Sequence, residues 1–186
     1  VVSISAGYLH SLALKSDGTA VAWGQSGAGQ AGVPPDLTNA VAVACGAGYG
    51  LALKANGAVM AWGDNNPEQT SIPAGLTDVV AIAGGSYHCL ALRANGTVAA
   101  WGSGTFGQTN VPAGLTNVVA VAAGQLHSLA LKADGAVVAW SDNYYGQTNV
   151  PAGLTNVVAI SAGGSHNIAL VGNGPPFLNT RLADRY

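Results

Sequence analysis

A repeat of 39 residues constrains this chain more than any other feature of its sequence. It is plainest in a set of evenly spaced tryptophans: Trp23, Trp62, Trp101 and Trp140. The same step relates a glycine slot and a leucine slot: Gly7, Gly46, Gly85, Gly124 and Gly163; Leu14, Leu53, Leu92, Leu131 and Leu170. A period of this length is typical of small units that bury their apolar faces only by stacking on their neighbours. The chain is therefore expected to be a tandem array with one continuous core.

Each unit carries the pattern of short β-strands. Residues 118–123 alternate with period 2 and are rich in valine, which predicts a first strand. Residues 127–132 place leucines on one side of a second strand, and residues 137–140 predict a third that ends in the tryptophan. A short fourth strand around Asn149 and Val150 would complete the unit.

Turn residues and a constant alanine indicate how these strands pack. Asp-Gly or Asn-Gly pairs follow the second strand, as at residues 134–135, and favour a two-residue type I′ hairpin between antiparallel strands. An alanine recurs within the second strand: Ala13, Ala52, Ala91, Ala130 and Ala169. A side chain kept this small predicts that an adjacent sheet lies close against that face.

Together these patterns predict an all-β protein, a β-propeller of about five incomplete blades with three to four antiparallel strands each. A linear β-solenoid is the rival fold, but it needs mainly parallel strands. The expected units are 1–39, 40–78, 79–117, 118–156 and a partial 157–174, which form one domain. Residues 175–186 read as a linker or a degenerate terminal strand.

Composition excludes several classes of partner. Hydrophobic residues make up 49% of the chain, yet no apolar run approaches the roughly 18 residues of a membrane-spanning helix. The chain has six basic and eight acidic side chains, and the basic ones form no cluster in the sequence. Neither nucleic acid nor a membrane surface is therefore an expected partner. Cys45 and Cys89 fall in different repeat slots, which favours small core fillers over a disulfide.

Histidines share one slot of the repeat, and a tyrosine takes the second copy: His10, Tyr49, His88, His127 and His166. Equivalent positions on facing sheets should lie about 10 Å apart, too far for shared zinc ligation at about 2 Å. Structural histidines bonded to a neighbouring corner backbone are therefore expected. No paired carboxylates or activated nucleophile stand out, so we predict neither an enzyme nor a metal or cofactor site.

Candidate binding residues come from aromatics that do not recur with the period. They fall in two variable segments, the corner between the first and second strands and the loop after the third: Tyr8, Tyr49 and Tyr87; Phe106, Tyr144 and Tyr145. A residue needed by the fold should recur as the tryptophans do. On rim loops, such side chains resemble the aromatic anchors of protein interfaces. The alternative is that each one merely covers its own loop.

The segment from Ala123 to Trp140, Ala-Gly-x-x-His-Ser-Leu-Ala-Leu-Lys-x-Asp-Gly-x-Val-x-Ala-Trp, resembles the repeat of the regulator of chromosome condensation superfamily. The short period and the Gly-Gln-Thr-x-Val-Pro linker at 107–112 and 146–151 resemble more closely the bacterial beta-lactamase inhibitor protein II family. That resemblance implies a seven-bladed propeller that binds a protein enzyme with one face. It also implies an extracellular or cell-surface bacterial protein. Because fewer than five full blades are present, the ring would need further sequence, a second chain or another mode of closure.

The sequence thus predicts a non-enzymatic module that presents variable aromatic loops to a protein partner, with an enzyme-inhibitor interaction as one specific form. Two alternatives stay open. One is a carbohydrate-binding propeller, and the other is a structural module whose incomplete blades join copies into a ring or fibre.

Overall fold

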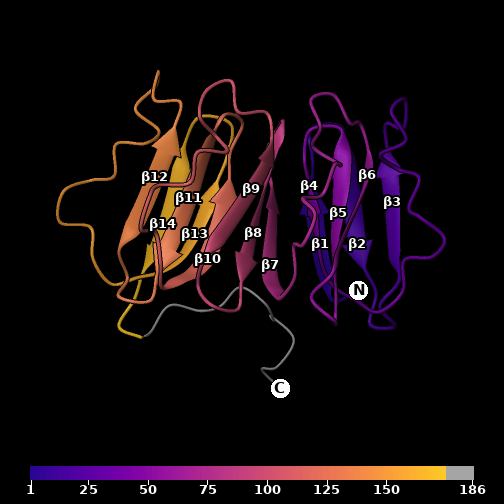
Figure 1. Ribbon diagram of the computed structural model, residues 1–186, viewed down its shortest axis with the longest axis horizontal. Helices are drawn as coiled ribbons and strands as arrows, with labels where there is room; N and C mark the ends of the chain where they lie inside the picture. The colour runs from indigo at the N-terminus through magenta and orange to yellow at the C-terminus, as the bar shows by residue number, and fades with distance from the viewer. Residues whose placement is uncertain (175–186) are drawn as a thin grey trace.

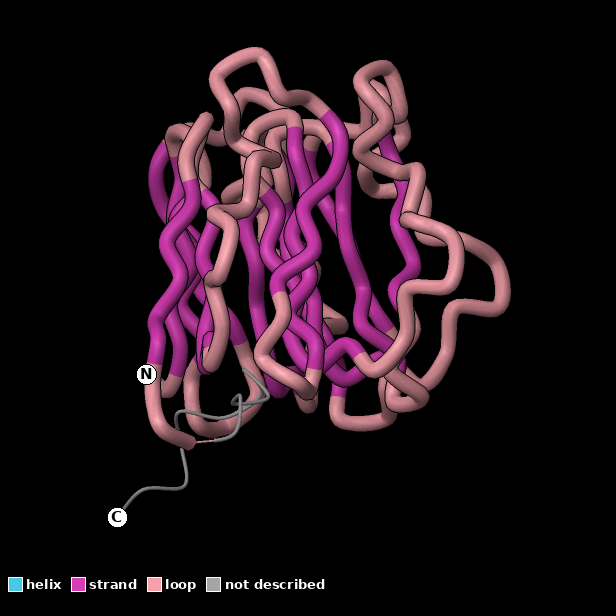
Figure 2. The backbone as a smooth tube through the Cα atoms, turned by 90° about the vertical axis from the view of Figure 1, so that its left-hand side faces the viewer, coloured by secondary structure: helices cyan, strands magenta, loops and turns pink. Residues whose placement is uncertain are grey.

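Five antiparallel sheets follow one another along the chain in a computed structural model that describes residues 1–174. Within each sheet the strands are paired in sequence order, and no helix occurs in the described part. Figure 1 shows the sheets succeeding one another from the N-terminal sheet to β13–β14, and Figure 2 shows strands running between two edges made of loops. Within the same residues no helix has the length and apolar character needed to cross a membrane.

Within residues 1–174 four sheets have three strands and the last has two. The first sheet contains β1 (Ser3–Ala6), β2 (His10–Leu14) and β3 (Ala20–Gly24). The second contains β4 (Ala40–Cys45), β5 (Tyr49–Lys54) and β6 (Val59–Gly63). The third contains β7 (Val79–Gly84), β8 (His88–Arg93) and β9 (Val98–Gly102). The fourth contains β10 (Val118–Ala123), β11 (His127–Lys132) and β12 (Val137–Ser141), and the fifth β13 (Val157–Ala162) and β14 (Asn167–Val171).

The predicted all-β propeller architecture is confirmed, and the antiparallel pairing excludes the solenoid. The fourth strand considered at Asn149 and Val150 does not form. Val150 N–H donates to Thr148 O in a local turn at 3.0 Å, and Pro151 has no N–H to offer to a ladder. The linker or terminal strand expected at 175–186 lies outside the described residues.

The hairpins after the second strands differ from the type I′ turns expected from sequence. Only the glycine of each pair has positive φ, as at Gly57 (79°), whereas type I′ requires it at both central residues. Gly57 N–H donates to Lys54 O at 2.9 Å, which is typical of a type I turn followed by a left-handed glycine. Asn56 has another role, because its Oδ1 accepts from Ala58 N at 3.1 Å.

Neighbouring sheets are joined by the tryptophans. Each buried indole Nε1 donates to a backbone carbonyl of the preceding unit: Trp62 to Gln30 O at 3.1 Å, Trp101 to Gln69 O at 2.9 Å and Trp140 to Gln108 O at 3.0 Å. Around each indole the leucines of one sheet pack against the constant alanine of the next, as Leu12 and Leu14 pack with Ala52. The sequence expectation of a sheet close against these alanines agrees with this packing.

Both ends of the array leave this packing unfinished. Trp23 in the first sheet is 54% exposed, whereas Trp101 is 6% exposed. At the other end, Ile168 and Leu170 of β14 are exposed, although the leucines in the same slots of β8, Leu90 and Leu92, are fully buried. The first and last sheets therefore expose apolar side chains in slots that an internal sheet buries against its neighbour.

We predict that Trp101→Phe lowers the free energy of unfolding by about 2 kcal/mol, because it removes the hydrogen bond to Gln69 O and leaves a small cavity. Trp23→Phe is the matched control and should cost less than about 0.5 kcal/mol, since that side chain is half exposed. Urea unfolding monitored by circular dichroism measures both values. Equal losses for the two variants would contradict the assigned role of the buried indoles.

Candidate protein-binding face

The order of strands brings two kinds of loop to the same edge of every sheet. The first strand runs up to the corner, the second returns from it, and the third runs back toward it. Direct hydrogen bonds join the two loops: Gln25 N to Leu9 O, Asp64 N to Gly48 O and Ser103 N to Tyr87 O, at 2.8 to 2.9 Å. In Figure 1 the loops after β3 and β12 project from the upper edge. We call this edge the corner face; it comprises the corners 7–9, 46–48, 85–87, 124–126 and 163–165 and the outer loops 25–30, 64–69, 103–108 and 142–147.

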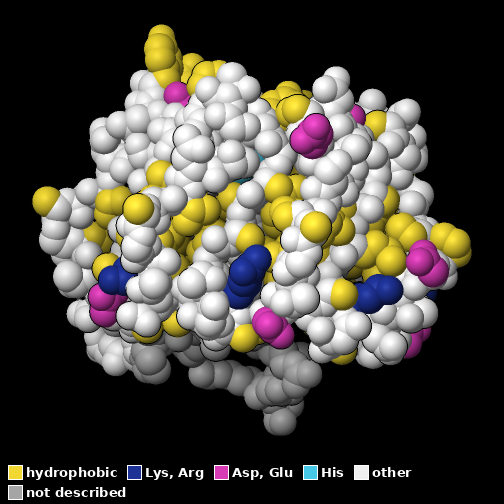
Figure 3. Space-filling model, in the orientation of Figure 1, with side chains coloured by type: hydrophobic (Ala, Val, Ile, Leu, Met, Phe, Trp, Pro, Cys, Tyr) yellow, Lys and Arg dark blue, Asp and Glu magenta, His cyan; other side chains and the backbone are white. Residues whose placement is uncertain are grey.

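Five of the six candidate aromatics are exposed on the corner face. Their exposed fractions range from 42% to 83%: Tyr8, Tyr87, Phe106, Tyr144 and Tyr145. Tyr144 and Tyr145 touch edge to face, with ring centroids 4.8 Å apart and an interplanar angle of 86°. In Figure 3 hydrophobic atoms protrude at the upper edge above β12.

The sixth aromatic, Tyr49, was wrongly placed among the exposed side chains. It is fully buried, and its hydroxyl lies 2.6 Å from His88 O and 2.9 Å from Gly85 O, both in the next sheet. Burial raises the pKa of this hydroxyl well above its ordinary value. As the first residue of β5, Tyr49 occupies the histidine slot rather than the corner, and the 39-residue spacing from His10 is the sequence signal that marks it.

The exposed aromatics form an inner and an outer group. Tyr8 and Tyr87 line a hollow of about 570 Å³ that is bounded by all five corners and their glycines. Phe106 and the Tyr144–Tyr145 pair lie in neighbouring outer loops, after β9 and β12. The structure therefore places Tyr8 and Tyr87 at one hollow and brings Tyr144 and Tyr145 into contact with each other.

Buried glutamines shape the outer loops, a role that sequence reasoning missed. The side-chain Oε1 of Gln108 accepts from Phe106 N at 2.8 Å, and that of Gln147 accepts from Tyr145 N at 2.9 Å. Gln147 Nε2 also donates to Asp142 Oδ2 at 2.6 Å. These bonds fix the backbone at Phe106 and Tyr145, whose side chains stay exposed on the corner face. The signal was available, because a glutamine recurs every 39 residues: Gln30, Gln69, Gln108 and Gln147.

The two edges of the array differ in their basic side chains. Within residues 1–174 every lysine and arginine lies near the end of a second strand, at the edge opposite the corner face: Lys15, Lys54, Arg93 and Lys132. In Figure 3 the visible basic side chains lie in the lower half of the molecule. The outer loops of the corner face contain Asp64, Glu68 and Asp142. The aromatic surface is therefore weakly acidic.

In the histidine slot, His88 belongs to a chain of buried hydrogen bonds. His88 Nε2 lies 3.0 Å from Ser128 Oγ, and Ser128 Oγ donates to Gln108 O at 3.2 Å. Since the hydroxyl proton goes to Gln108 O, Nε2 of His88 carries the hydrogen. Burial, together with a smaller effect of nearby His127, lowers the pKa of His88 to about 4. The partner is thus a side chain of the next sheet, not the corner backbone expected from sequence.

Both cysteines are free and buried. Burial raises the pKa of Cys45 to about 11 and that of Cys89 to about 12, so neither is a reactive thiolate at neutral pH. Cys89 Sγ lies 3.2 Å from Gln69 O, in the slot that Ser128 fills one unit later. Residues 1–174 bring together no group of three or more His, Cys, Asp or Glu side chains suited to a metal ion.

The profile of the regulator of chromosome condensation (RCC1) repeat matches residues 1–30, 40–66, 79–108 and 118–147, together more than half of the chain. The chain belongs to the RCC1 repeat family. Each matched stretch begins with the first strand of a sheet and continues past its tryptophan into the outer loop. A comparison with curated protein sequences finds no match.

Solved structures share this RCC1 propeller fold. Prp20p from Saccharomyces cerevisiae, described with its binding to Gsp1p and histones, is 18% identical with a TM-score of 0.77, covering 98% of this chain and 56% of that one. Yeast RCC1 (Prp20) bound to Kap60 is 24% identical with a TM-score of 0.74, covering 92% of this chain and 54% of that one. The ectodomain of the Physcomitrella patens receptor kinase CR4 is 24% identical with a TM-score of 0.79, covering 92% of this chain and 51% of that one. This chain spans about half the length of each.

We predict that acid weakens this RCC1 array through His88. Its folded pKa of about 4 lies below the ordinary 6.5, so between these values the unfolded chain binds a proton that the folded chain does not. The full contribution is present above pH 6.5 and is lost as pH falls toward 4, about 3 kcal/mol in all. Urea unfolding at a series of pH values measures this slope.

His88→Tyr is the diagnostic variant, because Tyr49 already fills the same slot one unit earlier. This variant should fold and should show a smaller loss of stability between pH 6.5 and 4. His166→Gln alters an exposed histidine in the same slot and should keep the slope of the unsubstituted chain. An unchanged slope in His88→Tyr would rule out His88 as the titrating group.

Proposed function

We propose that this chain is a non-enzymatic binding module that holds a protein partner on its corner face. The observation that carries the proposal is the gathering of five exposed aromatics, none in a slot that is aromatic in every unit, on one edge of the array. Tyrosine and phenylalanine supply large contact areas at a small cost in side-chain entropy, and they are enriched at the centres of protein interfaces. The glutamine bonds fix the backbone at two of them, Phe106 and Tyr145, before binding.

The charge distribution narrows the kind of partner. The outer loops carry acidic side chains and no lysine or arginine within the described residues, so a neutral or basic partner surface complements them. Protein partners are also described for the structural neighbours, Gsp1p and histones for Prp20p and Kap60 for yeast RCC1. Those partners are not assigned to this chain, because the likeness covers the fold alone.

An enzyme-inhibitor interaction is the specific form that the resemblance to the beta-lactamase inhibitor protein II family suggests. In this form the corner face would cover the active site of a secreted enzyme, and the protein would act outside a bacterial cell. Inhibition assays against a panel of beta-lactamases test this form directly. No inhibition by the folded chain would reject it and leave the wider proposal standing.

We predict that Tyr144→Ala and Tyr8→Ala each weaken partner binding by at least about tenfold, as expected for aromatic anchors. Both side chains are more than 80% exposed, so the free energy of unfolding should change by less than about 0.5 kcal/mol. Partners captured with the immobilised chain would be identified by mass spectrometry and their affinities measured by calorimetry. Lys132→Ala, at the opposite edge, is the matched control and should bind normally. Binding that survives both tyrosine substitutions would reject the corner face as the site.

Self-association is a second candidate, favoured by the exposed apolar faces at both ends of the array. Trp23 and Ile4 are exposed on the first sheet, and Ile168 and Leu170 on the last, in slots that internal sheets bury or half-bury. If copies join end to end, light scattering should show a mass above the 18.3 kDa monomer that Ile168→Arg reduces. A monomer at all concentrations would exclude this function.

A further inference from the structure

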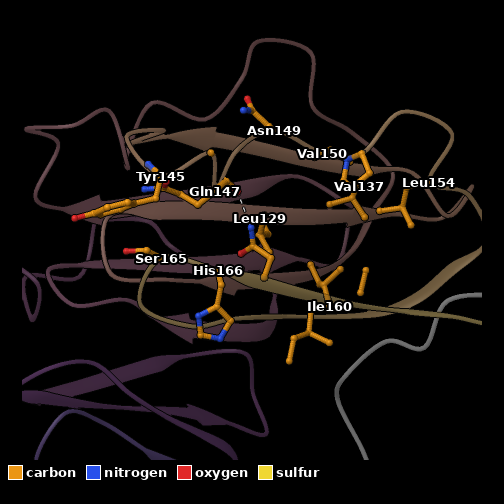
Figure 4. Close-up of a pocket in the computed structure, with 15 residues that line it drawn as sticks. Leu129, Val137, Tyr145, Gln147, Asn149, Val150, Leu154, Ile160, Ser165 and His166 are labelled. Atoms are coloured by element: carbon orange, nitrogen blue, oxygen red, sulfur yellow. Dashed lines mark hydrogen bonds between the residues drawn. The ribbon is translucent and has the colours of Figure 1, made fainter.

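The outer loops of the third and fourth units, 103–108 and 142–147, occupy the same place in the repeat, so each serves as a reference for the other. In the fourth outer loop a carboxylate lies within the loop. Asp142 Oδ2 accepts from Gln147 Nε2 at 2.6 Å, a short bond as expected for a charged acceptor. Figure 4 shows Gln147 beside Tyr145, whose N–H donates to Gln147 Oε1. One glutamine side chain thus bonds both the loop backbone and the carboxylate.

The third outer loop has the same glutamine but no carboxylate. Gln108 Oε1 accepts from Phe106 N at 2.8 Å, so its amide is oriented as in Gln147, with Nε2 directed toward the side chain at position 103. That side chain is Ser103, which is one carbon shorter than Asp142 in the same slot. In the described part of the chain Gln108 Nε2 has no hydrogen-bond partner, although the glutamine is fully buried. A buried donor without an acceptor is destabilising, and an oxygen placed as in the fourth outer loop would satisfy it.

Two hydroxyl groups add donors at this position. Ser103 Oγ and Thr105 Oγ1 lie 3.2 Å apart, and Thr105 N lies 3.5 Å from Ser103 Oγ, at the limit of a hydrogen bond. Within the pair only one hydroxyl proton is used, so the other is free for an acceptor. Ser103 is half-buried and Thr105 is exposed, which leaves both hydroxyls able to turn toward a ligand. The third outer loop therefore presents donors where its neighbour has a carboxylate.

The third outer loop is also held in place from the fourth sheet. Ser141 Oγ lies 2.8 Å from Phe106 O and 2.7 Å from Leu126 O. Ser141 has a φ of 91°, a value that favours glycine, and the same slot is glycine in the other units: Gly24, Gly63 and Gly102. Its hydroxyl thus offsets a strained backbone with a bond to a loop carbonyl. Because Phe106 is held at both its N–H and its carbonyl, the donors beside it are in position before a ligand arrives.

We propose that the third outer loop is a carboxylate-binding site, which takes an aspartate or glutamate side chain of the protein partner beside the exposed ring of Phe106. Asp142, bound in the same slot one unit later, shows the chemistry of the ligand. The partner as the source of the carboxylate rests on the proposed function, whereas the site itself does not. A partner surface with one acidic side chain at this loop, and otherwise neutral or basic, complements both these donors and the acidic side chains of the flanking outer loops.

The probe is acetate, titrated into the isotope-labelled full chain while the Gln108 side-chain amide and the Thr105 backbone amide are followed by NMR. Sodium chloride at the same ionic strength and acetamide, which has the same shape without the charge, are the comparisons. We expect a saturable shift of both resonances with acetate alone. The Kd should be on the order of 10 mM, because uncharged donors hold the anion and acidic side chains in the flanking loops oppose it. No shift, or equal shifts with acetamide, would overturn the proposal.

Ser103→Asp builds the carboxylate of the fourth outer loop into the third. This variant should melt about 2–4 °C higher, because Gln108 Nε2 gains an acceptor, and it should no longer bind acetate. Gln25→Asp adds the same charge at the same slot of the first unit and is the matched control, which should keep the acetate shift at Gln108. A Ser103→Asp variant that melts no higher than the unsubstituted chain, or that still binds acetate, rejects the site.

Partner binding distinguishes the two sources of the carboxylate. If a side chain of the partner occupies the site, Ser103→Asp should weaken partner binding at least about tenfold, because two carboxylates would compete for the same donors. Normal partner affinity in a variant that no longer binds acetate would reject the partner's side chain and leave a free carboxylate as the ligand. Tyr8→Ala, which tests the corner face, should leave the acetate shift unaltered, so this site and the proposed function can fail independently.

Discussion

The buried indole that joins one sheet to the sheet before it is the interaction on which the whole array depends. Short three-stranded sheets such as these expose apolar side chains on both faces and gain most of their stability by stacking. Each of the three buried tryptophans closes an apolar layer and satisfies a carbonyl of the preceding linker with the same side chain. Because that carbonyl belongs to a glutamine whose side chain holds the outer loop, the packing of the core and the shape of the corner face are set together.

The fold could be predicted from sequence because the repeat displays each structural slot several times. Constant alanines and tryptophans report contacts between sheets, and those contacts are alike in every unit. The turn type was misjudged for a physical reason: Asn56 contributes a side-chain acceptor to the hairpin and not a left-handed backbone, and both roles favour the same residue. The predicted fourth strand does not form, because its segment closes a local turn beside a proline.

The candidate site was harder to predict, because the repeat says which residues vary but not which way they point. Tyr8 and Tyr49 both occur near a corner, and only the 39-residue register separates an exposed corner residue from the first buried residue of a strand. The buried glutamines were recognisable in principle, but their side-chain bonds to the loop backbone required coordinates.

The hydrogen bonds that the buried indoles and the histidine slot make between sheets recur at nearly constant separations in the sequence, and this constrains how such chains can evolve. Each buried indole donates to a carbonyl 32 positions earlier. In the histidine slot, Tyr49 bonds a carbonyl 39 positions later and His88 bonds a hydroxyl 40 positions later. Gene duplication or loss of one whole unit preserves all of these separations, whereas an insertion within a strand shifts a donor out of register with its acceptor. Lineages of this kind should therefore vary more readily in the number of repeats and in the length of the exposed loops than in the length of the strands.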